Sequence, residues 1–179
     1  MIKACRQIDT SYPEDYSRVF TGLSPELAEG ATQTLNRALA DEIVLSAKTR
    51  DYHWNVAGPE FWELHRLFES QYEELAGIGD SVAKRIRALG GLAHGSLEES
   101  LKRSQLAESL EHALPARVMI ENLVVDHETI VRRLREDLET LPKQFHDVGT
   151  NALLTDLMEH HEMLAWMLRA CLEERGSQS

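Results

Sequence analysis

The spacing of apolar residues along this chain predicts four long amphipathic helices and no strand. The first helix is expected to begin after Ser24, a favourable N-cap followed by a proline, and to run to about Trp54. The second is expected from about Glu60 to Leu89, where "LGG" ends it. The apolar stripes of these two helices include Leu35, Leu39, Ile43, Phe61, Leu64, Phe68, Tyr72 and Leu75.

Two further long helices follow a connecting segment. A short helix is expected over residues 96–110, a third long helix from Pro115 with Pro142 after its end, and the last over about 150–174. The connection over 90–115 is long enough to cross the bundle, whereas the other two connections suit antiparallel neighbours. The pattern therefore predicts an all-α, ferritin-like four-helix bundle with a short helix between the second and third long helices.

Composition adds limits on function. The 179 residues, 42% of them hydrophobic and 27% charged, suit a single folded domain over residues 23–175, with tails at 1–22 and 176–179. The 30 acidic and 19 basic residues give a net charge of −11 without a basic patch, so nucleic acid binding is not expected. The chain shows neither a signal-peptide pattern nor an apolar run of membrane-spanning length, so we expect a cytoplasmic protein without a membrane partner.

Candidate metal chemistry lies in the stretch "DYHWNVAGPEFWELHRLFE", residues 51–69, and in the rest of the second helix. His65 and Glu69 are four residues apart and share a helix face. Asp80 and Lys84 do the same further along, about 16 Å away at 1.5 Å per residue, so the two pairs cannot meet on one ion within a chain. Such pairs are also common on solvated helix surfaces, and spacing alone leaves both interpretations open.

A two-fold dimer would bring these side chains together. If two copies of the second helix pack antiparallel about its middle, the residue numbers of facing positions add to 149. Glu69 of one copy then faces Asp80 of the other, and the isologous two-fold is the commonest oligomer symmetry. His65 in the same way faces Lys84, and His53, at the end of the first helix, is placed to join as a third ligand. Imidazole and carboxylate together suit iron or zinc.

The run "YHWNVAGPEFWELHRLFES…YEEL…IGDSVAKRIRALGG" closely resembles the Dps family, the mini-ferritins. The shared features are a histidine–tryptophan–asparagine start, a second histidine twelve residues after the first, an acid four residues later, and a downstream aspartate before leucine–glycine–glycine. The resembling motif covers about 40 residues without a gap, and the four-helix plan covers nearly all the rest.

The resemblance implies a hollow shell of twelve subunits that oxidises Fe(II), often with hydrogen peroxide, and stores the ferric mineral inside. It implies that His53, His65 and Glu69 of one subunit and Asp80 of its partner bind the iron, with zinc able to substitute. Glu69 stands where the family usually has aspartate, so its longer side chain changes the reach of the carboxylate. For Trp54 the resemblance suggests uptake of oxidising equivalents beside the site, and the simpler alternative is packing at an interface.

The main departure from the family pattern is Lys84, where the family normally has an iron-binding glutamate. A protonated ammonium cannot ligate a metal and repels Fe(II), and a deprotonated Lys84 that acts as a ligand is the less favoured alternative. We therefore expect Lys84 to form ion pairs with nearby carboxylates and to leave a weaker or single-metal site with impaired ferroxidase activity. The alternative function is a stress-protective shell that sequesters iron or zinc with weak or absent ferroxidase activity.

The remaining histidines carry no functional assignment at this point. The chain contains no Glu-x-x-His sequence, which argues against the di-iron centre that larger ferritin-like proteins build within one chain. His160 and His161, near Asp156 and Glu159, are therefore interpreted as solvated or packing residues.

Overall fold

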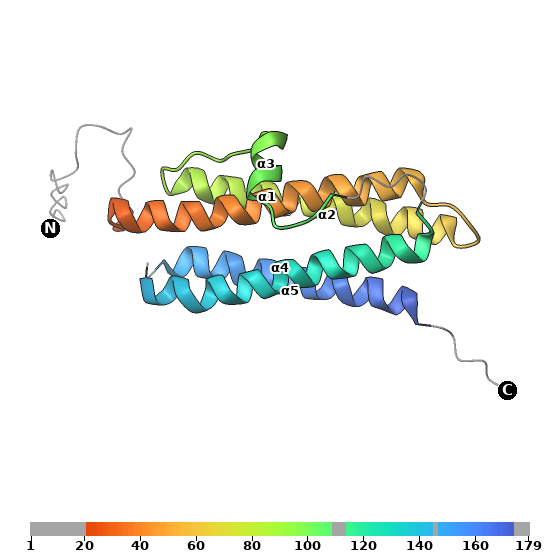
Figure 1. Cartoon of the computed structure of the whole chain (residues 1–179). Coiled ribbons are helices and arrows are strands. Elements are labelled where there is room, and N and C mark those ends of the chain that lie inside the picture. The colour runs from red at the N-terminus through yellow and green to blue at the C-terminus, as the bar shows by residue number, and fades with distance from the viewer. Residues whose placement is uncertain (1–20, 109–113, 145–146, 174–179) are drawn as a thin grey trace, which may run out of the picture.

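The computed structural model describes residues 21–108, 114–144 and 147–173, which contain five helices and no strand. The helices are α1 (Pro25–Asn55), α2 (Phe61–Ala88), α3 (Leu97–Arg103), α4 (Ala116–Gln144) and α5 (Val148–Leu172) (Figure 1). This order confirms the predicted all-α plan, with a short helix between the second and third long ones. Most of the two predicted tails, 1–22 and 176–179, lies outside the described residues.

The bundle consists of two helical hairpins that pack against each other (Figure 1). α1 and α2 form the first hairpin, and α4 and α5 form the second. α3 lies against α1, on the side away from the second hairpin. Because α1 also packs on α4, and α2 on α5, α1 and α5 stand diagonally opposite each other across the bundle.

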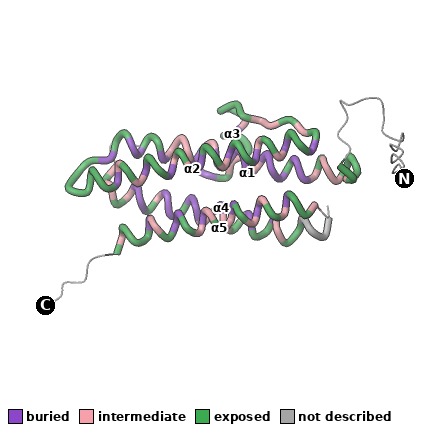
Figure 2. Tube along the Cα trace, turned by 180° about the vertical axis from the view of Figure 1, so that it is seen from behind, coloured by how far each residue is buried: buried purple, intermediate pink, exposed green. Residues whose placement is uncertain are grey.

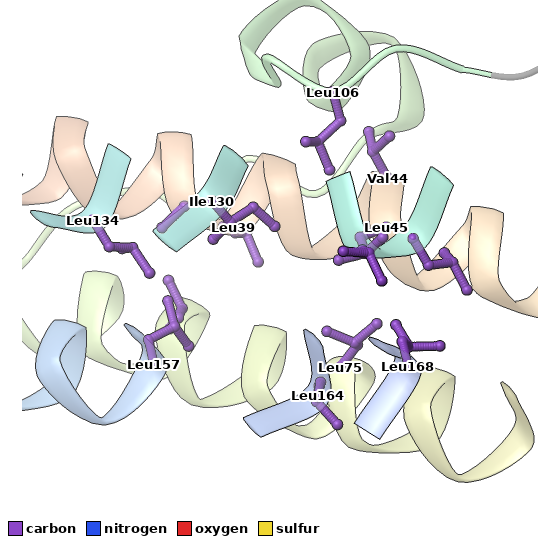
Figure 3. Close-up of a cluster of buried hydrophobic side chains, with 14 of the residues drawn as sticks. Leu39, Val44, Leu45, Leu75, Leu106, Ile130, Leu134, Leu157, Leu164 and Leu168 are labelled. Carbon is purple, nitrogen blue, oxygen red and sulfur yellow. The ribbon is translucent and has the colours of Figure 1, made fainter. Parts of the chain in front are cut away.

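The apolar core runs between the hairpins, and exposed residues line the outer surface (Figure 2). In a close-up of the core, Leu39 and Leu45 of α1 point toward the leucines of the facing helices (Figure 3). Leu106, just after α3, packs near Val44 and covers the outer side of α1 (Figure 3). Within the described ranges, no helix combines the length and the apolar character needed to cross a membrane. Fully buried side chains include Leu35, Phe68, Leu75, Leu123, Ile130, Leu154 and Leu164.

The short helix α3 differs from its prediction at one end. Its expected N-cap, Ser96, is confirmed, but the helix ends at Arg103, so the predicted extension toward residue 110 is wrong. Ser104 leaves the helix and donates its hydroxyl to Asp41 at 2.7 Å. Gln105 donates its backbone N–H to the same carboxylate at 3.0 Å. These contacts with α1 override the local helix preference of the segment.

The turn between α4 and α5 also differs from its prediction. α4 runs to Gln144, so the expectation that Pro142 follows its end is wrong. A proline in the last turn removes one helical hydrogen bond, which costs less than a break in the middle of a helix. α5 begins at Val148, two residues early, because the Asp147 carboxylate accepts the N–H of Thr150 at 3.2 Å and caps the helix.

Ion pairs connect the two hairpins in addition to the apolar core. They are Arg37–Asp137 at 2.9 Å, Lys48–Asp126 at 2.6 Å, Arg133–Asp41 at 3.0 Å and Arg85–Asp147 at 2.7 Å. Burial raises the pKa of Asp126 and of Asp137, against the effect of their basic partners. At Asp147, burial acts in the same direction, but hydrogen bonds from Thr150 and Arg85 outweigh it and lower the pKa. The contact between the hairpins is therefore partly electrostatic.

Candidate metal site

Two of the predicted ligands, His53 and His65, lie against each other and are called the histidine pair below. His53 is in the last turn of α1 and His65 is in the second turn of α2. The short turn between the helices, in which Gly58 adopts a φ of 116°, brings them together. The two imidazole rings stack with centroids 3.8 Å apart and planes 21° apart. His53 is only 7% exposed, whereas His65 is half-buried.

Backbone carbonyls determine the hydrogen positions of the histidine pair. Nδ1 of His53 is 2.8 Å from the carbonyl oxygen of His65, and Nδ1 of His65 is 2.9 Å from the carbonyl oxygen of His53. A carbonyl oxygen only accepts, so each Nδ1 carries a hydrogen and, in the neutral rings, each Nε2 keeps its lone pair. Neither Nε2 has a hydrogen-bond partner among the described residues. A fixed tautomer with an available Nε2 is the arrangement of a metal-binding histidine.

Aromatic side chains surround the histidine pair. Tyr72 lies edge-on to the His53 ring at 5.4 Å between centroids, and Phe61 lies 5.0 Å from the His65 ring. Trp54 is 66% exposed, and the Arg50 guanidinium stands 5.5 Å from its ring centroid. Tyr72 and Phe61 cover part of the pair, which strengthens the attraction between a bound cation and its ligands.

The predicted acidic ligands do not join the histidine pair within one chain. Glu69 is exposed one helical turn beyond His65. Asp80 is also exposed and forms an ion pair at 2.5 Å with Lys84 of its own helix. Within the described ranges, no group of three or more histidine, cysteine, aspartate and glutamate side chains is arranged to hold a metal ion. A single chain therefore presents two imidazoles together, without a carboxylate of the described residues beside them.

A second polar cluster, which the sequence interpretation missed, lies in the centre of the bundle. It consists of Glu42, His127 and His161, called the buried triad below, and none of the three is more than 1% exposed. Nε2 of His161 is 2.8 Å from the Glu42 carboxylate, and Nδ1 of His161 is 2.8 Å from Nδ1 of His127. Burial, reinforced by the neighbouring His161, lowers the pKa of His127 well below its ordinary value.

His160, next to His161 in the sequence, does not belong to the triad. His160 forms a partly exposed ion pair with Glu74 at 2.8 Å, as the solvated interpretation predicts. His161 does pack in the core, but as a hydrogen-bonded link between helices. A signal was present in the sequence, since Glu42 lies seven residues after Leu35 and three after Leu39, on the apolar face of the first helix.

Comparisons with known proteins agree with the fold. A family model of the ferritin-like domain matches residues 32–175. The chain is 44% identical to an "uncharacterized low temperature-induced protein" of Nostoc sp. over 156 residues, which is 87% of each protein. It is 35% identical to "DNA protection during starvation protein 2" of Bacillus anthracis over 142 residues, which is 79% of this chain and 96% of that protein.

A solved structure shares the fold of this chain. The Dps protein of Vibrio cholerae superposes with a TM-score of 0.79 and 35% sequence identity, over 85% of this chain and 94% of that chain. That protein is described as a member of a broad superfamily of ferritin-like diiron-carboxylate proteins.

Proposed function

Because this chain belongs to the Dps family of ferritin-like proteins, we propose that it is a mini-ferritin that oxidises Fe(II) at sites shared between subunits. Hydrogen peroxide is the proposed oxidant, which takes one electron from each of two Fe(II) ions. The ferric product is stored inside a shell of twelve identical subunits. The name of the Bacillus anthracis relative, which refers to protection during starvation, supports a stress-protective role.

The observation that carries this proposal is the histidine pair. Reciprocal hydrogen bonds to backbone carbonyls orient both rings before any metal arrives, so little ordering is needed on binding. Imidazole nitrogen is a good ligand for iron and also for zinc, which accounts for zinc as a substitute. In this proposal His53 and His65 bind iron directly, and Glu69, one turn from His65, supplies a carboxylate of the same chain.

A partner subunit completes the proposed site. Asp80 is too far along α2 to reach the histidine pair of its own chain, but an antiparallel copy of α2 brings it opposite Glu69. A groove of about 410 Å³ beside Asp80, lined mainly by small or apolar residues of α1, α2 and the segment that leads into α3, supports this pairing. We propose that a second copy of the chain occupies this groove.

Lys84 weakens the proposed site in two ways. Its ammonium holds Asp80 in an ion pair at 2.5 Å, so iron must displace Lys84 before this carboxylate can bind. Its positive charge also repels Fe(II). We therefore propose a weaker or single-metal site with slow oxidation, in agreement with the sequence interpretation. The alternative, a shell that sequesters iron or zinc with weak or absent oxidation, is favoured by the same ion pair.

The experiment that tests this function compares wild type with Lys84→Glu. Fe(II) bound per subunit and the initial rate of oxidation by peroxide should both rise in the variant. The rate should rise about tenfold or more, since a unit charge about 4 Å away contributes roughly 1 to 4 kcal/mol. Equal rates and equal binding in the two proteins would contradict the proposed role of Lys84.

A matched control separates the site from the overall charge. Lys102 forms the same kind of exposed pair, with Glu98 at 2.5 Å, on α3. Lys102→Glu should leave iron binding and oxidation unchanged. The mass of the assembly should correspond to twelve subunits, and a monomer would contradict the shared site. Iron uptake with negligible peroxide consumption, in wild type and in Lys84→Glu, would favour the sequestering alternative.

A further inference from the structure

The buried triad crosses the contact between the two hairpins. Glu42 belongs to α1 in the first hairpin, whereas His127 and His161 belong to α4 and α5 in the second. Because α1 and α5 stand diagonally opposite, the contact between Glu42 and His161 passes through the centre of the bundle. With exposed fractions of 1% or less, the three side chains are closed to water while the hairpins stay together.

The distances in the triad limit how many protons it can carry. Nε2 of His161 donates to the Glu42 carboxylate at 2.8 Å. Only one hydrogen fits between the Nδ1 atoms of His161 and His127, which are 2.8 Å apart, so one ring donates and the other accepts. If both rings became imidazolium, two N–H groups would point at each other. The triad therefore accommodates at most one imidazolium while its contacts last.

The charged groups around the triad cannot take up a second positive charge. Gly79 of α2 lies directly against Glu42, since a Cβ added at Gly79 would lie 3.6 Å from the Cβ of Glu42. A glycine brings no charge to the triad. Glu42 also lines a groove together with Arg50 of α1 and Asp80 of α2, and Asp80 is already paired with Lys84. Among the described residues, the acids that adjoin the triad in sequence also have basic partners: Asp41–Arg133, Asp126–Lys48, Glu128–Arg169 and Glu162–Arg135.

The direction of the pH effect follows from His127. Burial and the adjacent His161 lower its pKa in the folded state well below its ordinary value. An unfolded chain binds a proton on this residue below about pH 6.5, and the folded chain does not, so acid favours opening. The stability that His127 contributes is therefore complete above about pH 6.5 and declines as the pH falls below that value.

We propose that the buried triad is an acid-sensitive latch between the two hairpins. Above about pH 6.5 its two contacts hold α1 to α4 and α5. As the pH falls, a second imidazolium forms, the contact between the Nδ1 atoms breaks, and the hairpins part so that water reaches the charged ring.

Asp126 and Asp137 act in the opposite direction, since their raised pKa favours protonation in the folded chain. His160 of α5 also holds the hairpins together, through its pair with Glu74 of α2. The latch does not depend on the proposed iron chemistry.

The experiment follows the full-length protein from pH 7.5 to pH 4 by near-UV circular dichroism and by binding of the dye ANS. Wild type should lose near-UV signal and bind ANS with a midpoint between about pH 5 and 6. A variant with Glu42→Leu, His127→Leu and His161→Leu should open at least about one pH unit lower, because buried ionic clusters can be replaced by apolar residues. His160→Leu is the matched control and should open at the wild-type pH or slightly higher.

Two results would overturn the latch: wild type that stays closed to pH 4, or a triple variant that opens at the wild-type pH. Should the triple variant fail to fold, hydrogen exchange at the imidazole Cε1 atoms of wild type, followed by mass spectrometry, gives the same answer. His127 and His161 should exchange more than tenfold slower than His160 at pH 7.5, and should approach the exchange rate of His160 at the pH at which the near-UV signal is lost. Ordinary titration of His127 near pH 6.5 in a closed protein would also overturn the latch.

Discussion

The histidine pair and the buried triad use the same side chain for different purposes. In the pair, backbone carbonyls bind Nδ1 of both rings and leave both Nε2 atoms available. In the triad, both nitrogens of His161 are bonded, one to a carboxylate and the other to a second imidazole. Burial does not explain the difference, since His53 is itself only 7% exposed. Hydrogen-bond partners therefore distinguish the proposed iron ligands from His161.

The largest expected effect tests the structural role of the buried triad. His161→Ala removes the hydrogen-bond partner of Glu42 and leaves a carboxylate buried without compensation. The free energy of unfolding, measured by urea denaturation at pH 7.5, should fall by about 3 to 5 kcal/mol. His160→Ala breaks only a partly exposed pair and should cost less than about 1 kcal/mol. Equal losses in these two variants would remove the distinction between the triad and an ordinary surface pair.

The second-largest expected effect tests the proposed metal-binding role of the histidine pair. His65→Ala removes one available Nε2, so the affinity for Fe(II), measured by anaerobic calorimetry, should fall about 100-fold or more, equivalent to roughly 2.7 kcal/mol. His65→Ala should lower the free energy of unfolding by less than His161→Ala does, because His65 is only half-buried. His94→Ala, which alters a partly exposed histidine paired with Glu99, should not change the affinity. Unchanged affinity in the His65 variant would show that iron binds elsewhere.

The smallest expected effect concerns a link between the hairpins that does not use histidine. Asp147→Asn weakens the pair with Arg85 and the cap of α5, and should lower the free energy of unfolding by about 1 to 2 kcal/mol at pH 7.5. Asp156→Asn changes an exposed aspartate of the same helix and should alter the free energy of unfolding by less than about 0.5 kcal/mol. A loss at Asp147 as large as that of His161→Ala would mean that the triad has no special place in the contact between the hairpins.

Much of the fold could be predicted because helix starts depend on local sequence. Ser24 and the following proline mark the start of α1, and Ser96 marks the start of α3. The wrong boundaries depend on contacts that are distant in sequence. Ser104 ends α3 by binding Asp41, more than sixty residues earlier, and no local pattern contains that information.

The candidate site could be predicted in part for a similar reason. A short turn brings His53 to His65, so neighbours in sequence are neighbours in space. Lys84 was expected to pair with carboxylates across the two-fold axis, which stays a prediction. Within the single chain it pairs with Asp80 of its own helix, at the i, i+4 spacing that the sequence does show. Of the buried triad, the sequence signals only the placement of Glu42 on an apolar face. Its pairing with His161 and His127 could not be predicted, because it depends on which faces of three separate helices meet in the core.

The carboxylate of Asp147 closes the first turn of α5 and at the same time receives the Arg85 guanidinium from α2. An isolated second hairpin would lack this guanidinium, so its first turn would fray. In the intact chain, the backbone amides of that turn should become exposed to solvent only when the two hairpins part. At neutral pH, where the latch is closed, the subunit should therefore unfold in one cooperative step, with no stable half left behind.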